Sequence, residues 1–203
     1  MLFVEYDLKA DLLHLGERPK GGIFRPCLKT IPFSQISGAL NAQFGRNDFK
    51  AVGYLSGNGD FNSSSYLTYS PRDRHLGLSK VPLQVEYLSN VSASIIVSQN
   101  EAAELLPSEF DLLLGGLRSR GFGGCHLTKR KALDGKRVMP GKLNVRIPCT
   151  ERDPFNVRNV IQPIYGYLFK PLPNHYTGEY VLAYFEGSEV VAPSFLLKEE
   201  GNG

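Results

Sequence analysis

The order in which strand-like and helix-like hydrophobic patterns follow one another constrains the fold of this chain most. Residues Leu2–Leu8 alternate apolar and polar positions, which predicts a half-buried strand. The next pattern covers residues 32–44, where apolar residues recur every fourth position and predict a helix that starts near Pro32, with Ser34 as a possible cap. Strand-like runs follow at 51–55, 81–88 and 91–97.

A second helix is predicted from residue 108 to residue 121. Ser108 and Asp111 have the spacing of a capping box, and Pro107 precedes them. Four apolar residues then form one helical stripe, at Phe110, Leu113, Leu114 and Leu117.

The resulting order is strand, helix, two strands, helix, strand, which predicts an α+β fold built on a β-α-β-β-α-β ferredoxin-like (RRM-like) unit. We place this domain at residues 1–132, with a β-hairpin or thumb insertion at about 56–80. A β-rich extension follows at 133–203, with strands expected at 143–147, 160–169 and 180–185. Its alternating aromatic residues predict either core or a partner interface, at Tyr165, Tyr167, Phe169, Tyr180 and Tyr184.

The composition excludes several classes of protein. No apolar run approaches the roughly 20 residues that span a bilayer, and no signal peptide is recognisable, so we expect a cytoplasmic protein that does not contact a membrane. Cys27, Cys125 and Cys149 are odd in number and far apart, which fits neither a disulfide framework nor a zinc site. We therefore expect no metal and no cofactor. The net charge of +3 is too small to indicate a nucleic-acid binder by itself.

Residues 115–124 form a glycine-rich segment with chemistry suited to single-stranded RNA. Glycine leaves main-chain N–H groups uncovered, arginine grips phosphates or stacks on bases, and an aromatic ring offers a flat face. The alternative is an ordinary helix C-cap, with arginines that complement the helix dipole. The loop residues expected to meet RNA are Gly115, Gly116, Arg118, Ser119, Arg120, Gly121, Phe122, Gly123 and Gly124.

Basic residues gather between positions 118 and 146, where Asp134 is the one acid. Such local clustering can attract a polyanion despite a small net charge. The Lys129–Lys131 triplet also fits an ordinary solvated face. The cluster consists of Arg118, Arg120, Lys129, Arg130, Lys131, Lys136, Arg137, Lys142 and Arg146.

Two motifs resemble those of the RAMP (repeat-associated mysterious protein) superfamily of CRISPR-associated proteins. The first is the glycine-rich loop, with matching residues at Gly116, Arg118, Gly121, Phe122 and Gly123. The second is the segment Ile-Pro-Phe-Ser-Gln-Ile-Ser-Gly-Ala-Leu at residues 31–40, which resembles the opening of helix one in these families. Together the motifs anchor about the first 130 residues.

The resemblance is strongest to the group that caps the 5′ end of CRISPR RNA. It implies a non-catalytic RNA-binding subunit of an effector ribonucleoprotein that holds the 5′ handle and docks the backbone and large subunits, with a lean towards type III or type IV systems. The insertion would fold over the RNA as a thumb. Further RNA contacts are expected at Ser34, Ser37, Arg72, Arg74, His126, Lys129 and Arg130.

Two rival functions stay open, besides a backbone subunit of the same complex, which would need an exposed acid on a long loop near the RNA. A metal-independent endoribonuclease that processes repeat RNA would need a histidine base, for which His126 and His75 are the candidates. His14 has an apolar context that favours a structural role, and His175 fits a turn. The other rival is a β-rich protein–protein adaptor without an RNA role. We expect no catalytic residue.

Overall fold

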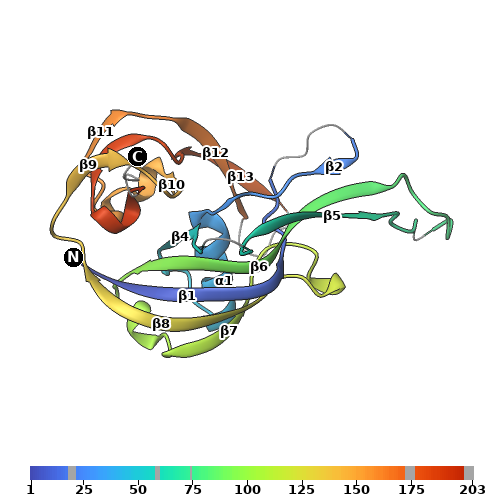
Figure 1. Cartoon of the computed structure of the whole chain (residues 1–203), viewed down its shortest axis with the longest axis horizontal. Coiled ribbons are helices and arrows are strands. Elements are labelled where there is room, and N and C mark those ends of the chain that lie inside the picture. Colours follow the sequence, from blue (N-terminus) through green and yellow to red (C-terminus); the bar gives the residue numbers. More distant parts are fainter. Residues whose placement is uncertain (18–21, 58–59, 74, 172–176, 199–203) are drawn as a thin grey trace.

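The computed structural model describes residues 1–17, 22–57, 60–73, 75–171 and 177–198 (Figure 1). One α-helix lies in this part of the chain, α1 (Phe33–Phe44). The strands are β1 (Leu2–Leu13), β2 (Phe24–Arg25), β3 (Thr30–Ile31), β4 (Ala51–Leu55), β5 (Ser63–Tyr69), β6 (Leu83–Ser98), β7 (Glu109–Leu113), β8 (Gly124–Asp134), β9 (Met139–Lys142), β10 (Ile147–Pro148), β11 (Asn159–Gln162), β12 (Tyr165–Pro171), β13 (Gly178–Tyr184) and β14 (Glu189–Ala192).

The main sheet has the strand order β3-β4-β6-β1-β8-β7, and every neighbouring pair along this path is antiparallel. Strand β6 is 16 residues long and pairs with four other strands along its length. Its second half pairs with β1 and β4, whereas its first half pairs with β5 and, over two residues, with β2. Strands β5, β6 and β2 therefore extend together beyond the sheet, as an arm on the right of Figure 1.

Helix α1 covers one face of this sheet, and the helix predicted at residues 32–44 is confirmed. Its Ile36 and Leu40 are fully buried in the same core as Tyr6 and Leu8 of β1, which explains the four-residue spacing. The helix ends at Gly45, which takes a left-handed conformation at φ 63°. The N-cap position belongs to Pro32 and has no side-chain cap, so the expected cap at Ser34 is wrong.

The helix predicted at 108–121 is wrong, because residues 109–113 form strand β7 at the edge of the sheet. Three consecutive leucines make the period ambiguous, and pairing with β8 selects the strand. Leu112 and Leu114 face the core, while Leu113 of the expected helical stripe is 54% exposed. The main-chain N–H of Lys129 donates to the carbonyl of Ser108 at 2.7 Å, so the expected cap residue takes part in strand pairing.

Residues after 134 form two small antiparallel sheets, β10-β13-β12 and β11-β14-β9. They pack on one end of the main sheet through a second core in which Phe3 and Phe33 contact Phe155. Figure 1 shows this C-terminal part above the main sheet, with β9, β10 and β11 at the end away from the arm and with β12 and β13 running toward the start of the arm. The structure thus confirms a mixed α+β protein that is mostly β-sheet.

The expectations about membrane spans, disulfides and metal sites can be compared with the part of the chain that the structure describes. No helix in this part is long and apolar enough to cross a membrane. Cys27, Cys125 and Cys149 are free thiols. Within the described ranges, no group of three or more His, Cys, Asp or Glu residues is arranged to hold a metal ion.

Candidate nucleic-acid interface

A groove of about 1200 Å³ lies where the glycine-rich loop, α1 and the β12–β13 hairpin meet. Gly115, Gly116 and Arg118 of the loop form one wall, and Ser34 in the first turn of α1 lies on another. The third wall comes from the C-terminal part, with Tyr167, Phe169 and Tyr180. The groove therefore joins both of the sequence motifs with a region that neither motif covers.

The glycine-rich loop is held against the end of β1 by main-chain hydrogen bonds. The N–H of Gly116 donates to the carbonyl of His14 at 2.9 Å, and the N–H of Gly123 donates to the carbonyl of Leu12 at 2.8 Å. A Cβ atom at Gly115 would collide with that same His14 carbonyl. The absence of a side chain at Gly115 lets the loop approach β1 closely. Three of the glycine N–H groups expected to be free for RNA are already used, because Gly121 also donates to the carbonyl of Arg118 at 3.1 Å.

The two arginines of the loop lie in the exposed turn η2 (Arg118–Arg120), together with Ser119. The Nε of Arg118 donates to the carbonyl of Gly115 at 3.1 Å, which holds the guanidinium beside the groove. The guanidinium of Arg120 stacks 3.8 Å from the ring centroid of Tyr69, at the end of β5. Arg120 therefore connects the loop to the arm, whereas Arg118 borders the groove.

Phe122 is not available to stack on a base in this structure. Its side chain is 6% exposed and meets the ring of Tyr87 edge to face, with 5.1 Å between centroids. This packing fixes the loop to β6. The adjacent Gly123 is buried as well, while Gly121 and Gly124 lie at the surface.

Two serines at the start of α1 have different surroundings. Ser34 is partly exposed and lines the groove, and its contact with RNA stays a prediction. Ser37 is 3% exposed, and its Oγ donates to the carbonyl of Ala51 at 3.1 Å and accepts from the N–H of Ala51 at 2.9 Å. The prediction that Ser37 contacts RNA is therefore wrong, because the hydroxyl is used to attach α1 to β4.

The β12–β13 hairpin presents an aromatic face, whose alternating sequence pattern predicted core or a partner interface. Tyr167 is 66% exposed and Tyr180 is 62% exposed, while Leu168 on the opposite face of the hairpin is buried. Phe169 and Tyr180 pair across the strands with 5.6 Å between ring centroids. Tyr167, Phe169 and Tyr180 are not core, whereas Tyr184 of the predicted set is 8% exposed and belongs to the second core. Only the long-range packing of the C-terminal part brings the three exposed rings to the groove.

His14 lies at the floor of the groove, although its apolar sequence context indicated only a structural role. The side chain is 8% exposed, and its Nδ1 lies 2.8 Å from the main-chain carbonyl oxygen of Glu86. A carbonyl oxygen only accepts, so Nδ1 carries the proton. Burial lowers the pKa of the His14 imidazole below its ordinary value, which favours the neutral ring.

Arg146 also borders the groove, but its charge is balanced. It forms two hydrogen bonds to the carboxylate of Glu186, at 2.6 and 2.7 Å, and its guanidinium lies 4.1 Å from the ring centroid of Phe185. The pair joins the groove to the second core. Arg118 is thus the more exposed of the two guanidinium groups that line it.

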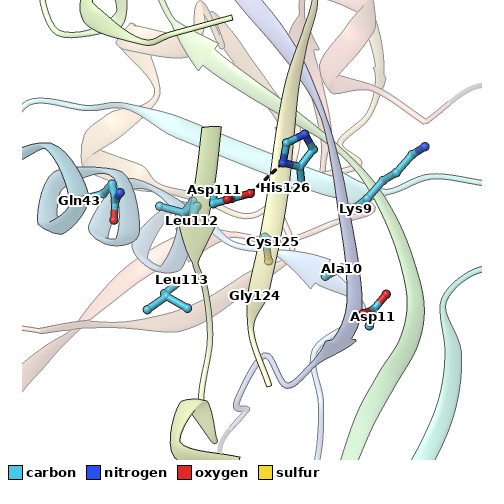
Figure 2. Close-up of a pocket in the computed structure, with 10 residues that line it drawn as sticks. All are labelled: Lys9, Ala10, Asp11, Gln43, Asp111, Leu112, Leu113, Gly124, Cys125 and His126. Carbon is cyan, nitrogen blue, oxygen red and sulfur yellow. Dashed lines mark hydrogen bonds and ion pairs between the residues drawn. The ribbon is translucent and has the colours of Figure 1, made fainter. Parts of the chain in front are cut away.

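His126 lies on the face of the sheet opposite α1 and does not join the groove. Its neighbours Cys125 and Leu127 point into the core beneath α1, so strand alternation turns His126 outward. Nδ1 donates to Asp111 at 2.8 Å and Nε2 donates to Glu109 at 2.7 Å. The ring is turned toward Asp111 (Figure 2) and lines a second hollow of about 630 Å³, which shares Gln43 and Leu113 with the groove. These bonds, to Asp111 first and then Glu109, raise the pKa of His126.

The remaining predicted contacts are dispersed over the molecule. Arg130 points to the acids of β1, with Nη1 3.3 Å from Glu5 and 3.8 Å from Asp7, and Lys129 is exposed on the same strand. Arg130 stands six residues beyond Gly124, about 20 Å along β8. Arg72 is exposed near the tip of the arm, where it bridges to Ser79. Arg74 and His175 lie outside the described residues.

Comparisons with known proteins show a likeness of fold. No family model and no curated protein matches the sequence. One similar solved structure is a chain of the type III-B Cmr-beta complex bound to cognate target RNA and AMPPnP. It has a TM-score of 0.58 and 10% identity, over 92% of this chain and 86% of that chain. Another is a chain of a CRISPR RNA-guided surveillance complex, with a TM-score of 0.50 and 13% identity over 98% of this chain and 95% of that chain.

Proposed function

We propose that this chain is a non-catalytic, RNA-binding subunit of a CRISPR effector ribonucleoprotein, and that it holds the 5′ handle of the CRISPR RNA. The observation that carries the proposal is the groove, where the glycine-rich loop and Arg118 face the exposed aromatic residues of the β12–β13 hairpin. A single strand of RNA needs both chemistries, one for its backbone and one for its bases.

One wall of the groove suits the RNA backbone, and the opposite wall suits the bases. Arg118 offers a guanidinium to a phosphate oxygen on the wall that it shares with Gly115 and Gly116. On the other side, the exposed rings of Tyr167 and Phe169 offer flat faces to bases. The arrangement favours no particular base, since every base has a face that can stack.

The topology supports membership of the RAMP superfamily as part of the same proposal. Strands β4-β6-β1-β8 with α1 between β1 and β4 have the order of a ferredoxin-like unit in which the second helix is missing. The similar structures are chains of CRISPR complexes, one of them a type III-B complex, which agrees with the lean towards type III. In this proposal the neighbours are the backbone and large subunits.

The arm formed by β5 and β6 is the candidate thumb. The arm is joined to the glycine-rich loop at two places: Tyr69, at the outer end of β5, stacks under Arg120, and Tyr87 of β6 packs on Phe122. A movement of the arm would therefore be transmitted to the loop that borders the groove. Arg72 places a positive charge toward its far end.

The geometry around His126 supports binding over cleavage at that residue. Both ring nitrogens are hydrogen-bonded to carboxylates, which favours the doubly protonated ring, and such a ring has no lone pair to act as a base. The residue also lies on the sheet face away from the groove. His75 is exposed on the arm, where its main-chain N–H donates to the Asp73 carboxylate in a turn.

A salt titration of RNA binding tests the proposal. Labelled CRISPR repeat RNA is titrated with the wild type, Arg118→Ala and Arg137→Ala at several salt concentrations. Arg137 is an exposed arginine outside the groove, so the two variants lose the same charge at different places. We expect Arg118→Ala to bind more weakly and to lose about 0.7 from the slope of log K against log salt, as for one lost phosphate contact with a single strand.

Arg137→Ala should bind as the wild type does. Equal losses in both variants would indicate non-specific attraction and would refute the groove as the binding site. Wild type that does not bind RNA would favour the adaptor function, and wild type that cuts the repeat RNA would favour the endoribonuclease.

A further inference from the structure

We infer that His14 is a specificity-determining residue, whose Nε2 accepts a hydrogen bond from a ribose 2′-hydroxyl and so makes the groove select RNA over DNA. This inference rests on the proposed function, because it concerns a strand bound in the same groove. It adds a chemical class, the ribonucleotide sugar, that neither sequence motif specifies.

The tautomer of His14 is fixed by its contact with β6. Nδ1 donates its proton to the main-chain carbonyl of Glu86 at 2.8 Å, and a main-chain oxygen cannot reverse that role. In a neutral ring the second nitrogen then carries a lone pair and no proton. The surrounding structure therefore presents Nε2 as an acceptor.

That acceptor has no partner among the described residues, yet it is placed where a ligand can reach it. His14 lines the groove and lies between two glycines. A Cβ atom at Gly16 would lie 3.6 Å from Nε2, and one at Gly116 would lie 3.2 Å from Cδ2. Because neither position has a side chain, the approach to the ring edge stays open.

The neighbours of His14 indicate which part of a nucleotide lies above it. Gly116 and Arg118 belong to the wall that suits the sugar–phosphate backbone, whereas the aromatic rings that suit bases are on the β12–β13 hairpin. Phosphate oxygens only accept hydrogen bonds at neutral pH. The 2′-hydroxyl is the group of an RNA backbone that can donate to Nε2, and DNA lacks it.

Three oligonucleotides that differ only at the 2′ position test this inference. Wild type is titrated with oligouridylates of about eight nucleotides, carrying 2′-hydroxyl, 2′-fluoro or 2′-deoxy sugars. The 2′-fluoro sugar keeps the RNA-like pucker but cannot donate a hydrogen bond. We expect the 2′-hydroxyl strand to bind about three- to tenfold more tightly than either of the others, as for one neutral hydrogen bond.

The variant His14→Phe keeps a flat ring and removes the acceptor. It should bind the deoxy strand as the wild type does and should lose the preference for the 2′-hydroxyl strand. A folded His14→Phe that keeps the preference would overturn the role of His14. The comparison of 2′-hydroxyl with 2′-fluoro strands on wild type needs no variant, so it can overturn the inference even where His14→Phe folds poorly.

The contrary outcomes separate this inference from the proposed function. Equal binding of all three strands by wild type overturns the role of His14 and leaves RNA binding in the groove intact. Failure of wild type to bind any strand overturns both. Shortening of the 2′-hydroxyl strand by wild type but not by His14→Phe would make the imidazole a catalytic base, which also contradicts a selectivity role.

Discussion

Gly121 and Gly123 allow the packing of the glycine-rich loop to be tested with a matched pair of substitutions. Both have a φ angle of 83°, so alanine at either position meets the same backbone penalty, roughly 1–2 kcal/mol. Their surroundings differ. A Cβ atom at Gly121 would have nothing within 4 Å, whereas at Gly123 it would come closer than 3.0 Å to the carbonyl oxygen of Leu114.

The two variants should differ in stability because the main chain has to move only in Gly123→Ala. Main chain has to shift to accept the methyl group at Gly123, which costs about 1–3 kcal/mol as overpacking. The same shift threatens two hydrogen bonds, Gly123 N–H to Leu12 at 2.8 Å and Leu114 N–H to Gly123 at 2.9 Å. At about 1 kcal/mol each, these bring the expected excess cost of Gly123→Ala over Gly121→Ala to about 3–5 kcal/mol.

Urea denaturation followed by far-ultraviolet circular dichroism measures this difference, since the chain has no tryptophan to report by fluorescence. Gly121→Ala should also keep its affinity for repeat RNA, while Gly123→Ala should lose affinity because one wall of the groove is displaced. Equal free energies of unfolding for the two variants would refute the close packing of the loop on β7.

Two further predictions concern residues whose roles changed between sequence and structure. Phe122→Ala should lower the free energy of unfolding by about 3–5 kcal/mol, because it empties the site against Tyr87, and should leave the salt slope of RNA binding unchanged; a change in slope without loss of stability would restore the stacking role. We expect the pKa of His126 to be raised, mainly by its hydrogen bond to Asp111. Any stability that this contact contributes is then fully present below the pKa of the histidine in the unfolded chain, and it is lost as pH rises through the pKa in the folded chain. In an NMR titration Asp111→Asn should lower the His126 midpoint, and an unchanged midpoint would contradict the contact.

The sequence predicts well those elements whose secondary structure is determined by residues close together in the chain. In helix α1 the apolar residues recur every fourth position, and in strand β4 they form a short continuous run. Each segment therefore fits one kind of secondary structure. The segment around Leu112–Leu114 is different, because three leucines in a row satisfy both the helical and the strand period. The pairing partner decided the outcome there, and sequence spacing does not reveal it.

The candidate site was predictable only in part for the same reason. Gly115, Gly116, Arg118 and Ser34 belong to the recognised motifs and do meet at one groove. His126 follows the loop closely in sequence, yet strand alternation places it on the far face of the sheet.

The residues that were missed come from long-range contacts. Tyr167 reaches the groove only through packing of the C-terminal part, and the tautomer of His14 depends on a carbonyl 72 residues away. The local alternation of aromatic residues marks Tyr167 as core or a partner interface, but no local signal shows that Tyr167 or His14 reaches the groove.

The most direct test of the groove as an RNA site compares Tyr167→Ala with Tyr165→Ala. Both tyrosines lie on β12 with 66% and 56% of their surface exposed, but only Tyr167 lines the groove. Fluorescence anisotropy with labelled repeat RNA should show an affinity about five- to a hundredfold weaker for Tyr167→Ala, the value of one stacked base. Tyr165→Ala should bind as the wild type does, and both should melt near the wild-type temperature. Unchanged affinity in Tyr167→Ala, or an equal loss in both variants, would contradict the proposal that RNA lies in this groove.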